Sequence, residues 1–335
     1  MHRTTALGYF LVFVVLGVYT NNVYADQSDI TTKRATDIVK QWIQWVEKHN
    51  ISEASIAISY NGQLVAQQGA ARTANSPAPV ASLTKAVTGI CIAKLASEGK
   101  LSFDSKLQVL APQLNSDVSI GSLLTHTSGY RSDITQRPNS FPDLDKEHLQ
   151  WIAEQEMDAG QIAPEGEGFA YNNANYAMLG NVISTITNQT YEQACNELVF
   201  RSIGIEDAAL NPDWRIMSSW GGWKTSAVSY LKFIDTYFAN NKVLDQNPEL
   251  YPHHSFTGGV NYGMGIFFRN GRNGGINFWH DGKWHTDING IEYRFASYTA
   301  KWDNGWAVST NHNISAINGE HTELDQVLSE AAHRP

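Results

Sequence analysis

The sequence predicts an α/β fold in which an antiparallel sheet is flanked by helices and interrupted by a mostly helical region. Apolar strand patterns occur near both ends of the 335-residue chain, at residues 54–66 and again after Gly258. The stretch between them carries few strand signals and several prolines. Strands at both ends imply one sheet with an α/β part of about 26–100 and 216–335 around a helical part of about 101–215.

The first 25 residues are typical of an export signal. Met1-His2-Arg3 is a short basic start, Ala6 to Val18 is almost wholly apolar, and Val23-Tyr24-Ala25 has the small-residue spacing that signal peptidase reads. The apolar run is shorter than the roughly 20 residues that a bilayer span needs, and a retained anchor is the alternative. We therefore expect a periplasmic or secreted mature chain, residues 26–335, without a stable membrane span.

Composition limits the partners and the covalent cross-links. A formal net charge of −9 argues against nucleic-acid binding, which needs a basic face. The two cysteines, Cys91 and Cys195, do not make a disulfide framework. Each lies in an apolar stretch of helical character, so we expect two separate buried thiols, with one bridge as the alternative in an oxidising compartment.

An amphipathic helix over residues 30–49 and a β-hairpin open the mature chain. Apolar residues recur at helical spacing from Ala35 to Val46. Alternating apolar residues run from Ile56 to Tyr60, and a second apolar segment, Leu64 to Ala66, follows Asn61-Gly62. Asn-Gly between two such runs is the strongest short hairpin signal, because both turn residues need positive φ.

A second helix is expected to begin near Ser82, since Pro77 and Pro79 keep the preceding segment extended and Gly99 supplies a stop. The last third of the chain returns to antiparallel strands. These strands are expected at Tyr262 to Phe268, Ile276 to His280, Ile291 to Thr299 and Trp306 to Ser309, followed by a closing helix over 321–332.

Ser82-Leu83-Thr84-Lys85 is the first group with catalytic potential. Residues i and i+3 share a helix face, so the Lys85 amine can reach the Ser82 hydroxyl. A serine at a helix start also lies near the positive end of the helix dipole, where an oxyanion is favoured. Ser-x-x-Lys alone is weak evidence, because an N-cap serine beside a solvated lysine has the same spacing.

Two later groups change this interpretation. Tyr171-Asn172-Asn173 stands between a loop and a helix, where a tyrosine is usually a core or lid residue. His280-Asp281-Gly282 lies on an expected strand. A glycine two residues after an imidazole on an edge strand lets a substrate backbone lie against the strand.

Taken in order, Ser-x-x-Lys, Tyr-x-Asn and His-x-Gly resemble the three signatures of the serine β-lactamase-related hydrolases. This superfamily includes class C β-lactamases, D-Ala-D-Ala carboxypeptidases, D-aminopeptidases and family VIII esterases. The string Leu123-Leu124-Thr125-His126-Thr127-Ser128-Gly129 is similar to its most recognisable segment. The resemblance runs from about residue 54 to 311 and implies the fold of β-lactamases and penicillin-binding-protein transpeptidases.

The resemblance implies an acyl-enzyme mechanism without a metal or organic cofactor. Ser82 would attack an acyl carbon, and Lys85 and Tyr171 would share the proton transfers. A lysine needs burial or a neighbouring cation to act as a base near neutral pH. A tyrosinate beside Lys85 is the other option, and the sequence leaves both open.

The remaining site residues follow from the same resemblance. Asn173 would orient the substrate amide or side chain, and His280 and Gly282 would border the substrate. The backbone amide of Lys283 would complete an oxyanion hole with the Ser82 amide. His126 would be structural and close a turn.

The third motif departs from relatives that carry lysine at its first position. His280, with an ordinary pKa of ~6.5, is mostly neutral at pH 7. Asp281 would repel a substrate carboxylate if it faced the cleft, and strand alternation offers the alternative of an outward, solvated side chain. The segment from Lys283 to Asp287 also lacks the Gly- and Pro-containing loop of many relatives. We therefore expect poor β-lactam turnover and a preference for uncharged esters or for amides without a terminal carboxylate.

The predicted function is an exported serine hydrolase acting on a small-molecule or peptide substrate, such as a D-amino-acid peptide (including one from peptidoglycan) or a small ester. A class C-like β-lactamase and a catalytically silent cell-wall-peptide-binding module are the alternatives. Four tryptophans near the motifs suggest an aromatic-walled cleft, although ordinary core packing explains each one equally well. They are Trp220, Trp223, Trp279 and Trp284.

Overall fold

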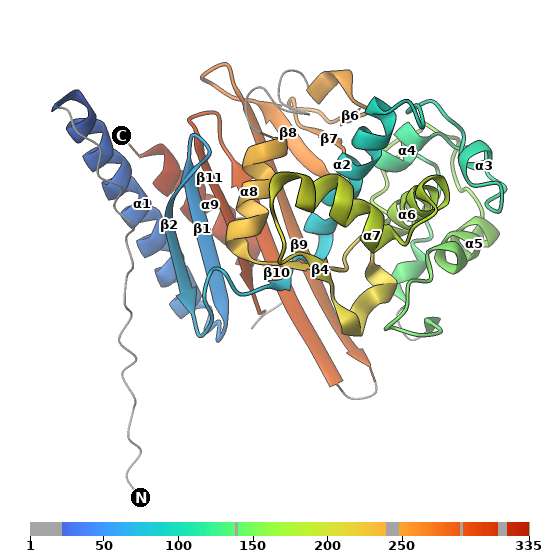
Figure 1. Ribbon diagram of the computed structural model, residues 1–335, viewed down its shortest axis with the longest axis horizontal. Coiled ribbons are helices and arrows are strands. Elements are labelled where there is room, and N and C mark those ends of the chain that lie inside the picture. Colours follow the sequence, from blue (N-terminus) through green and yellow to red (C-terminus); the bar gives the residue numbers. More distant parts are fainter. Residues whose placement is uncertain (1–21, 138–139, 239–247, 289–290, 314–319, 335) are drawn as a thin grey trace, which may run out of the picture.

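The computed structural model describes residues 22–137, 140–238, 248–288, 291–313 and 320–334. Within these ranges an antiparallel sheet of eight strands has the order β2-β1-β11-β10-β9-β8-β7-β6. The N-terminal strand β1 lies beside the C-terminal strand β11, with Ile58 opposite Val308 (Figure 1). A sheet built from both ends of the chain confirms the predicted α/β architecture.

The strand boundaries are β1 (Ala54–Tyr60), β2 (Gln63–Ala70), β6 (His254–Ser255), β7 (Asn261–Gly263), β8 (Ile266–Asn270), β9 (Ile276–Ile288), β10 (Ile291–Lys301) and β11 (Trp306–His312). A small second sheet contains β3 (Ala78–Pro79), β5 (Trp223–Thr225) and β4 (Ala209–Leu210).

The predicted hairpin at Asn61-Gly62 is confirmed by the pairing of β1 with β2. The prediction of one strand from Tyr262 to Phe268 was wrong, because this segment is the hairpin β7–β8. Met264 and Gly265 adopt φ values of 54° and 80° at its turn, as a two-residue hairpin turn requires. A methionine is not a typical turn residue, which explains why the sequence did not indicate the break.

The helices are α1 (Asn22–Lys48), α2 (Thr84–Ser97), α3 (Leu107–Leu110), α4 (Ile120–Leu124), α5 (Leu149–Ala159), α6 (Asn173–Thr187), α7 (Tyr191–Cys195), α8 (Ala227–Tyr237) and α9 (Glu320–His333). The predicted helices over 30–49, after Ser82 and over 321–332 are all present. None of the described helices combines the length and the hydropathy needed to cross a membrane.

Helices cover both faces of the sheet. The buried stripe of α1, which includes Ile38 and Trp42, packs with Leu324 of α9 against one face. Leu231 of α8 packs with Ala307 of β11 on the other face, and α3 to α7 extend this layer beyond α2 (Figure 1). The sheet and this second layer of helices meet at the start of α2.

Two parts of the predicted organisation stay predictions. Most of the predicted export signal, residues 1–25, lies outside the described residues. The division of the chain near residues 101 and 215 into an α/β and a helical part is likewise an interpretation of the sequence.

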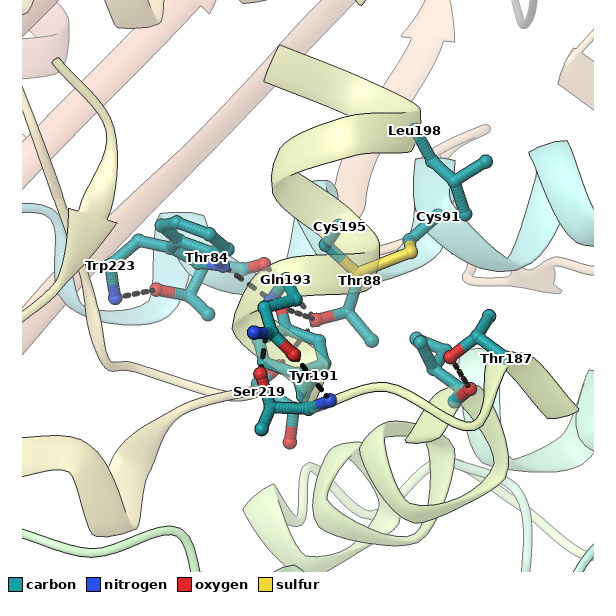
Figure 2. The surroundings of a disulfide bond; sticks show 12 residues. Thr84, Thr88, Cys91, Thr187, Tyr191, Gln193, Cys195, Leu198, Ser219 and Trp223 are labelled. Atoms are coloured by element: carbon teal, nitrogen blue, oxygen red, sulfur yellow. Dashed lines mark hydrogen bonds between the residues drawn. A yellow bond between two sulfur atoms is a disulfide. The ribbon is translucent and has the colours of Figure 1, made fainter. Parts of the chain in front are cut away.

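The prediction of two separate thiols was wrong, because Cys91 of α2 and Cys195 of α7 form a disulfide (Figure 2). Their Cα atoms lie 5.6 Å apart, within the range that a disulfide spans. Next to the bridge, the Thr88 and Tyr191 hydroxyls are hydrogen-bonded at 2.7 Å. The bridge closes a long segment of the chain and ties α2, which follows Ser82 directly, to the helical layer.

Candidate active site

Ser82 lies in a 3-10 helix, η1 (Ala81–Leu83), directly before α2. Ala81 adopts a φ of 46°, a left-handed conformation that costs roughly 1–2 kcal/mol for a residue with a side chain. The surroundings hold this conformation. The Ser297 hydroxyl of β10 donates a 2.5 Å hydrogen bond to the Val80 carbonyl and so fixes the backbone that leads into η1.

The Lys85 amine is fully buried beside the Ser82 hydroxyl. Its Nζ donates to Ser82 Oγ at 3.2 Å and to the Trp220 carbonyl at 2.9 Å. Burial lowers the pKa of Lys85 to about 7, against an opposing effect of the Asp133 carboxylate. A substantial fraction of the amine is therefore unprotonated at neutral pH and can accept the serine proton.

Tyr171 also lies beside the lysine, with its ring centroid 4.8 Å from Lys85 Nζ. Although 38% of the residue is exposed, the protein around the hydroxyl raises its pKa well above the ordinary value, and a hydrogen bond with Ser82 opposes this rise. The tyrosine is therefore protonated at neutral pH. The lowered pKa of Lys85 and the raised pKa of Tyr171 favour the lysine as proton acceptor and the tyrosine as proton donor.

A buried carboxylate that the sequence analysis missed holds the loops beside Tyr171. Glu156 of α5 accepts hydrogen bonds from the backbone N–H groups of Ser132, Asp133 and Ile134 at 3.1, 3.2 and 3.0 Å, and from Asn172 Nδ2 at 2.7 Å. The carboxylate thereby joins the 132–134 loop to the 171–173 segment. An acidic residue among the apolar residues of the segment 149–159 was the only available sequence signal.

Asn173 and His126 complete this side of the site. Asn173 Nδ2 donates to Thr135 Oγ1 at 3.0 Å, while its Oδ1 is buried without a partner among the described residues. His126 has a φ of 55° in a turn, and its Nδ1 accepts the Asn172 N–H at 3.2 Å. Asn173 therefore presents a free acceptor, and His126 supports the backbone next to Tyr171.

The third motif, His280-Asp281-Gly282, lies on β9 just beyond the point where the pairing with β8 ends. Strand β8 pairs with β9 only as far as Trp279, so the edge from His280 onward has no strand partner on that side among the described residues. A Cβ on Gly282 would lie 2.8 Å from the Ser82 nitrogen and 2.7 Å from the Val80 oxygen. Only glycine lets the β9 backbone approach the start of η1 this closely.

His280 is a neutral ring whose centroid lies 6.3 Å from that of Tyr171. It is buried, and desolvation lowers its pKa to about 4 against the opposing charge of Asp281. Its Nδ1 lies 2.5 Å from the Asp281 carbonyl oxygen, to which it donates. The buried Nε2 is then an acceptor, and it has no partner among the described residues.

Asp281 lies on the outer face of β9, the orientation that strand alternation offered, so its carboxylate is not placed to repel a substrate carboxylate beside Ser82. Its Oδ2 lies 3.0 Å from His321 Nδ1 of α9, and half of its side chain is exposed. Burial alone would raise the pKa of Asp281, but the His321 hydrogen bond and nearby positive groups hold it at about 2. Strand alternation places the Lys283 side chain on this same outer face, so only the Lys283 backbone borders the cleft.

The four tryptophans near the motifs are mostly core residues, which agrees with ordinary core packing and not with an aromatic-walled cleft. Trp220 and Trp223 are fully buried, Trp284 is almost so, and Trp279 is half-buried. No group of three or more His, Cys, Asp or Glu side chains in the described residues is arranged to hold a metal ion.

Comparisons with known proteins identify the family and the fold. Residues 38–318 match the family model described as Beta-lactamase. Protein flp of Staphylococcus aureus (strain NCTC 8325 / PS 47) is 31% identical over 179 residues, which are 47% of this chain and 36% of that protein. The chain thus spans about a third of the length of this curated relative.

Solved structures share the fold at low identity. The octameric penicillin-binding protein homologue from Pyrococcus abyssi superposes with a TM-score of 0.67 and 19% identity over 87% of this chain and 76% of that one. The D-stereospecific amidohydrolase from Streptomyces sp. superposes with a TM-score of 0.69 and 16% identity over 91% of this chain and 98% of that one. These likenesses confirm the predicted fold class.

Proposed function

The chain belongs to the Beta-lactamase family, whose members are serine hydrolases, and we propose that it is an exported hydrolase that cleaves an amide or ester through an acyl-enzyme on Ser82. The observation that carries this proposal is the pair formed by Ser82 Oγ and Lys85 Nζ, 3.2 Å apart. A buried amine with a pKa of about 7 beside a hydroxyl at a helix start is the arrangement that an activated serine needs.

In the proposed acylation, Lys85 Nζ takes the Ser82 proton as Oγ attacks the substrate carbonyl carbon. The tetrahedral intermediate then collapses, the bond to the leaving group breaks, and the Tyr171 hydroxyl gives its proton to the departing nitrogen or oxygen. The Lys85 ammonium restores the tyrosine proton. In deacylation, water attacks the acyl carbon while Lys85 Nζ takes its proton. The bond from this carbon to Ser82 Oγ then breaks, Lys85 returns the proton to Oγ, and the acid is released.

The backbone amides of Ser82 and Lys283 are the proposed oxyanion hole. The close approach of Gly282 to the Ser82 nitrogen supports this assignment, because it brings the β9 backbone next to the nucleophile. One such donor typically contributes about 2.7–4 kcal/mol to transition-state stabilisation. Asn173 Oδ1, the buried free acceptor, would take a substrate N–H.

The neutral state of His280 is the reason to propose substrates without a carboxylate at this position. A lysine there would offer a full positive charge, whereas a neutral ring with a free Nε2 acceptor favours a hydrogen-bond donor or an uncharged group. Amides of D-amino acids and small esters fit this requirement, and the fold is shared with a protein described as a D-stereospecific amidohydrolase. A class C-like β-lactamase and a silent peptide-binding module are the alternatives that experiment must exclude.

Covalent labelling tests the proposal directly. A fluorophosphonate should add once to the purified protein, on Ser82 by peptide mass spectrometry. Ser82→Ala should lose labelling and should lower kcat by several orders of magnitude. Ser97→Ala, at an exposed serine on α2, is the matched control and should retain both properties.

A substrate screen then separates the alternatives. Purified protein would be assayed with nitrocefin, p-nitrophenyl esters, a D-Ala-D-Ala peptide and D-amino-acid p-nitroanilides. We expect the esters or the anilides to be cleaved fastest. Efficient turnover of nitrocefin would favour the β-lactamase alternative, and a folded Ser82→Ala protein with full activity would refute the acyl-enzyme.

A further inference from the structure

Four half-buried rings form a continuous surface beside the proposed active site, which we name the aromatic rim: Phe169, His254, Phe256 and Phe267. Phe169 contacts Phe256 and His254 with ring centroids 4.9 and 5.6 Å apart, and Phe256 lies 6.3 Å from Phe267. Rings that pack against one another yet remain partly exposed are available to a ligand.

The aromatic rim begins at two residues of the candidate site, Tyr171 and His280. The Phe267 ring centroid is 5.6 Å from His280, and that of Phe169 is 6.5 Å from Tyr171. The fully buried Tyr262 ring supports it from below, 4.8 Å from Phe267 and 5.4 Å from Phe169. Contact with Tyr171 and His280 makes the rim continuous with the cleft.

The position of the rim identifies the part of the substrate that it would meet. The acyl carbon is held at Ser82 and at the backbone of Lys283, further along β9 than His280. The leaving group must receive its proton from Tyr171, whose ring is 6.3 Å from that of His280. The leaving group therefore lies on the side of Tyr171 and His280, which is the side of the aromatic rim.

At the opposite end of the β9 edge, the ring that faces the Ser82 side is covered by its neighbours. Trp284, the next cleft-facing residue after Gly282, is almost fully buried. Its ring packs 5.7 and 5.6 Å from those of Trp214 and Trp220. These rings are already covered by one another, whereas the rim keeps part of its surface exposed.

The rim is also held in place. Trp279, which precedes His280 on β9, stacks on Phe267 with ring centroids 5.8 Å apart and an interplanar angle of 16°. A supported ring loses little side-chain freedom when a ligand covers it, so binding is less opposed by entropy.

We propose that the aromatic rim is a leaving-group subsite that selects an uncharged aromatic leaving group, such as an aryl-substituted alcohol or amine. This inference rests on the proposed acyl-enzyme at Ser82. The neutral His280 and the exposed ring surface favour an apolar group at the same position, since neither supplies a positive charge for a carboxylate.

Paired esters test the subsite. Benzyl and ethyl esters of one acyl group have alkoxide leaving groups of similar basicity, so their ratio of kcat/KM reports recognition of the ring. We expect a ratio of ten or more for the wild type. Phe267→Ala should reduce the ratio to about two, mainly through a higher KM for the benzyl ester, and Phe267→Leu should give an intermediate value.

Two controls keep the outcomes distinct. Tyr60→Ala truncates a half-buried aromatic residue that packs on Trp306 of β11, and it should keep the wild-type ratio. Fluorophosphonate labelling of Ser82 in Phe267→Ala should show that the nucleophile is intact. A wild-type ratio near one, or an unchanged ratio in labelled Phe267→Ala, would overturn the subsite alone. Absence of labelling and turnover in the wild type would overturn both proposals.

Discussion

The candidate site has two walls, which are built by different interactions. One wall, formed by the 132–134 loop and the 171–173 segment, is fixed by hydrogen bonds that converge on the Glu156 carboxylate. The other wall, formed by β7, β8 and the start of β9, consists of packed rings around Tyr262. There His280 keeps a buried nitrogen without a partner among the described residues.

The difference indicates a division of tasks. Hydrogen bonds are directional, so the first wall sets the positions of Tyr171 and Asn173. Aromatic packing tolerates small shifts but excludes water, so the second wall mainly sets polarity. It supplies the burial that keeps His280 neutral, and Lys85, at the junction of the walls, depends on both.

The largest effect is expected where the walls meet. Lys85→Ala and Tyr171→Phe should each lower kcat/KM by roughly 10²–10⁴, because each removes a proton-transfer group. The double variant should lose little more than either single one, because both groups serve the same hydroxyl. Steady-state kinetics checks this expectation, with Lys94→Ala on the same helix as the control. Fully additive losses would contradict a shared role.

Glu156→Gln breaks the first wall without removing volume. The amide can replace only some of the acceptor positions and must place its NH₂ against at least one of the backbone donors. We expect the free energy of unfolding to fall by about 1–3 kcal/mol, measured by urea denaturation, and kcat to fall about tenfold. Glu154→Gln, on the same helix and paired with Gln150, should change neither quantity. Unchanged kcat in a destabilised Glu156→Gln would restrict Glu156 to a structural role.

The pH dependence of kcat/KM tests whether His280, in the second wall, stays neutral. A base works only when deprotonated, so with a Lys85 pKa of about 7 kcat/KM should be half-maximal near pH 7, level off about one unit above it, and approach a tenfold fall per unit at lower pH. His280, with a pKa of about 4, is already neutral over this range and should add no step. The acidic limb should therefore keep its midpoint in His280→Gln. Disappearance of the limb in that variant would assign it to the histidine.

Asp281→Asn should have the smallest effect, because its side chain faces α9 and lies outside both walls. We expect kcat/KM for neutral and for carboxylate-bearing substrates to change by less than about twofold, a shift worth under ~0.5 kcal/mol. The His321 pair keeps the pKa of Asp281 below its unfolded value. Its stabilisation is therefore present above pH ~3.9 and is lost as the pH falls toward 2. Because the Asp281 side chain is half exposed, this stabilisation is about 1 kcal/mol or less, measurable by thermal unfolding. A selective gain for carboxylate substrates would revive the discarded orientation.

The sequence by itself determined the features that depend on neighbours a few residues apart. The amphipathic helix α1 and the Asn61-Gly62 hairpin follow from local periodicity and turn chemistry. The approach of Lys85 to Ser82 follows from the helical i, i+3 spacing. Family resemblance added Tyr171 and His280, which the structure brings to the same cleft.

Only the tertiary structure decided the features that depend on distant segments. Cys91 and Cys195 are separated by 104 positions, and no local pattern shows that α2 and α7 meet. The role of Glu156 follows only from the fold, because its hydrogen-bond donors lie in the 132–134 loop. The partner of Asp281, His321, likewise comes from the distant helix α9. The physical reason is that periodicity records which face of an element is buried, whereas a hydrogen-bond or disulfide partner is fixed by the packing of whole elements against one another.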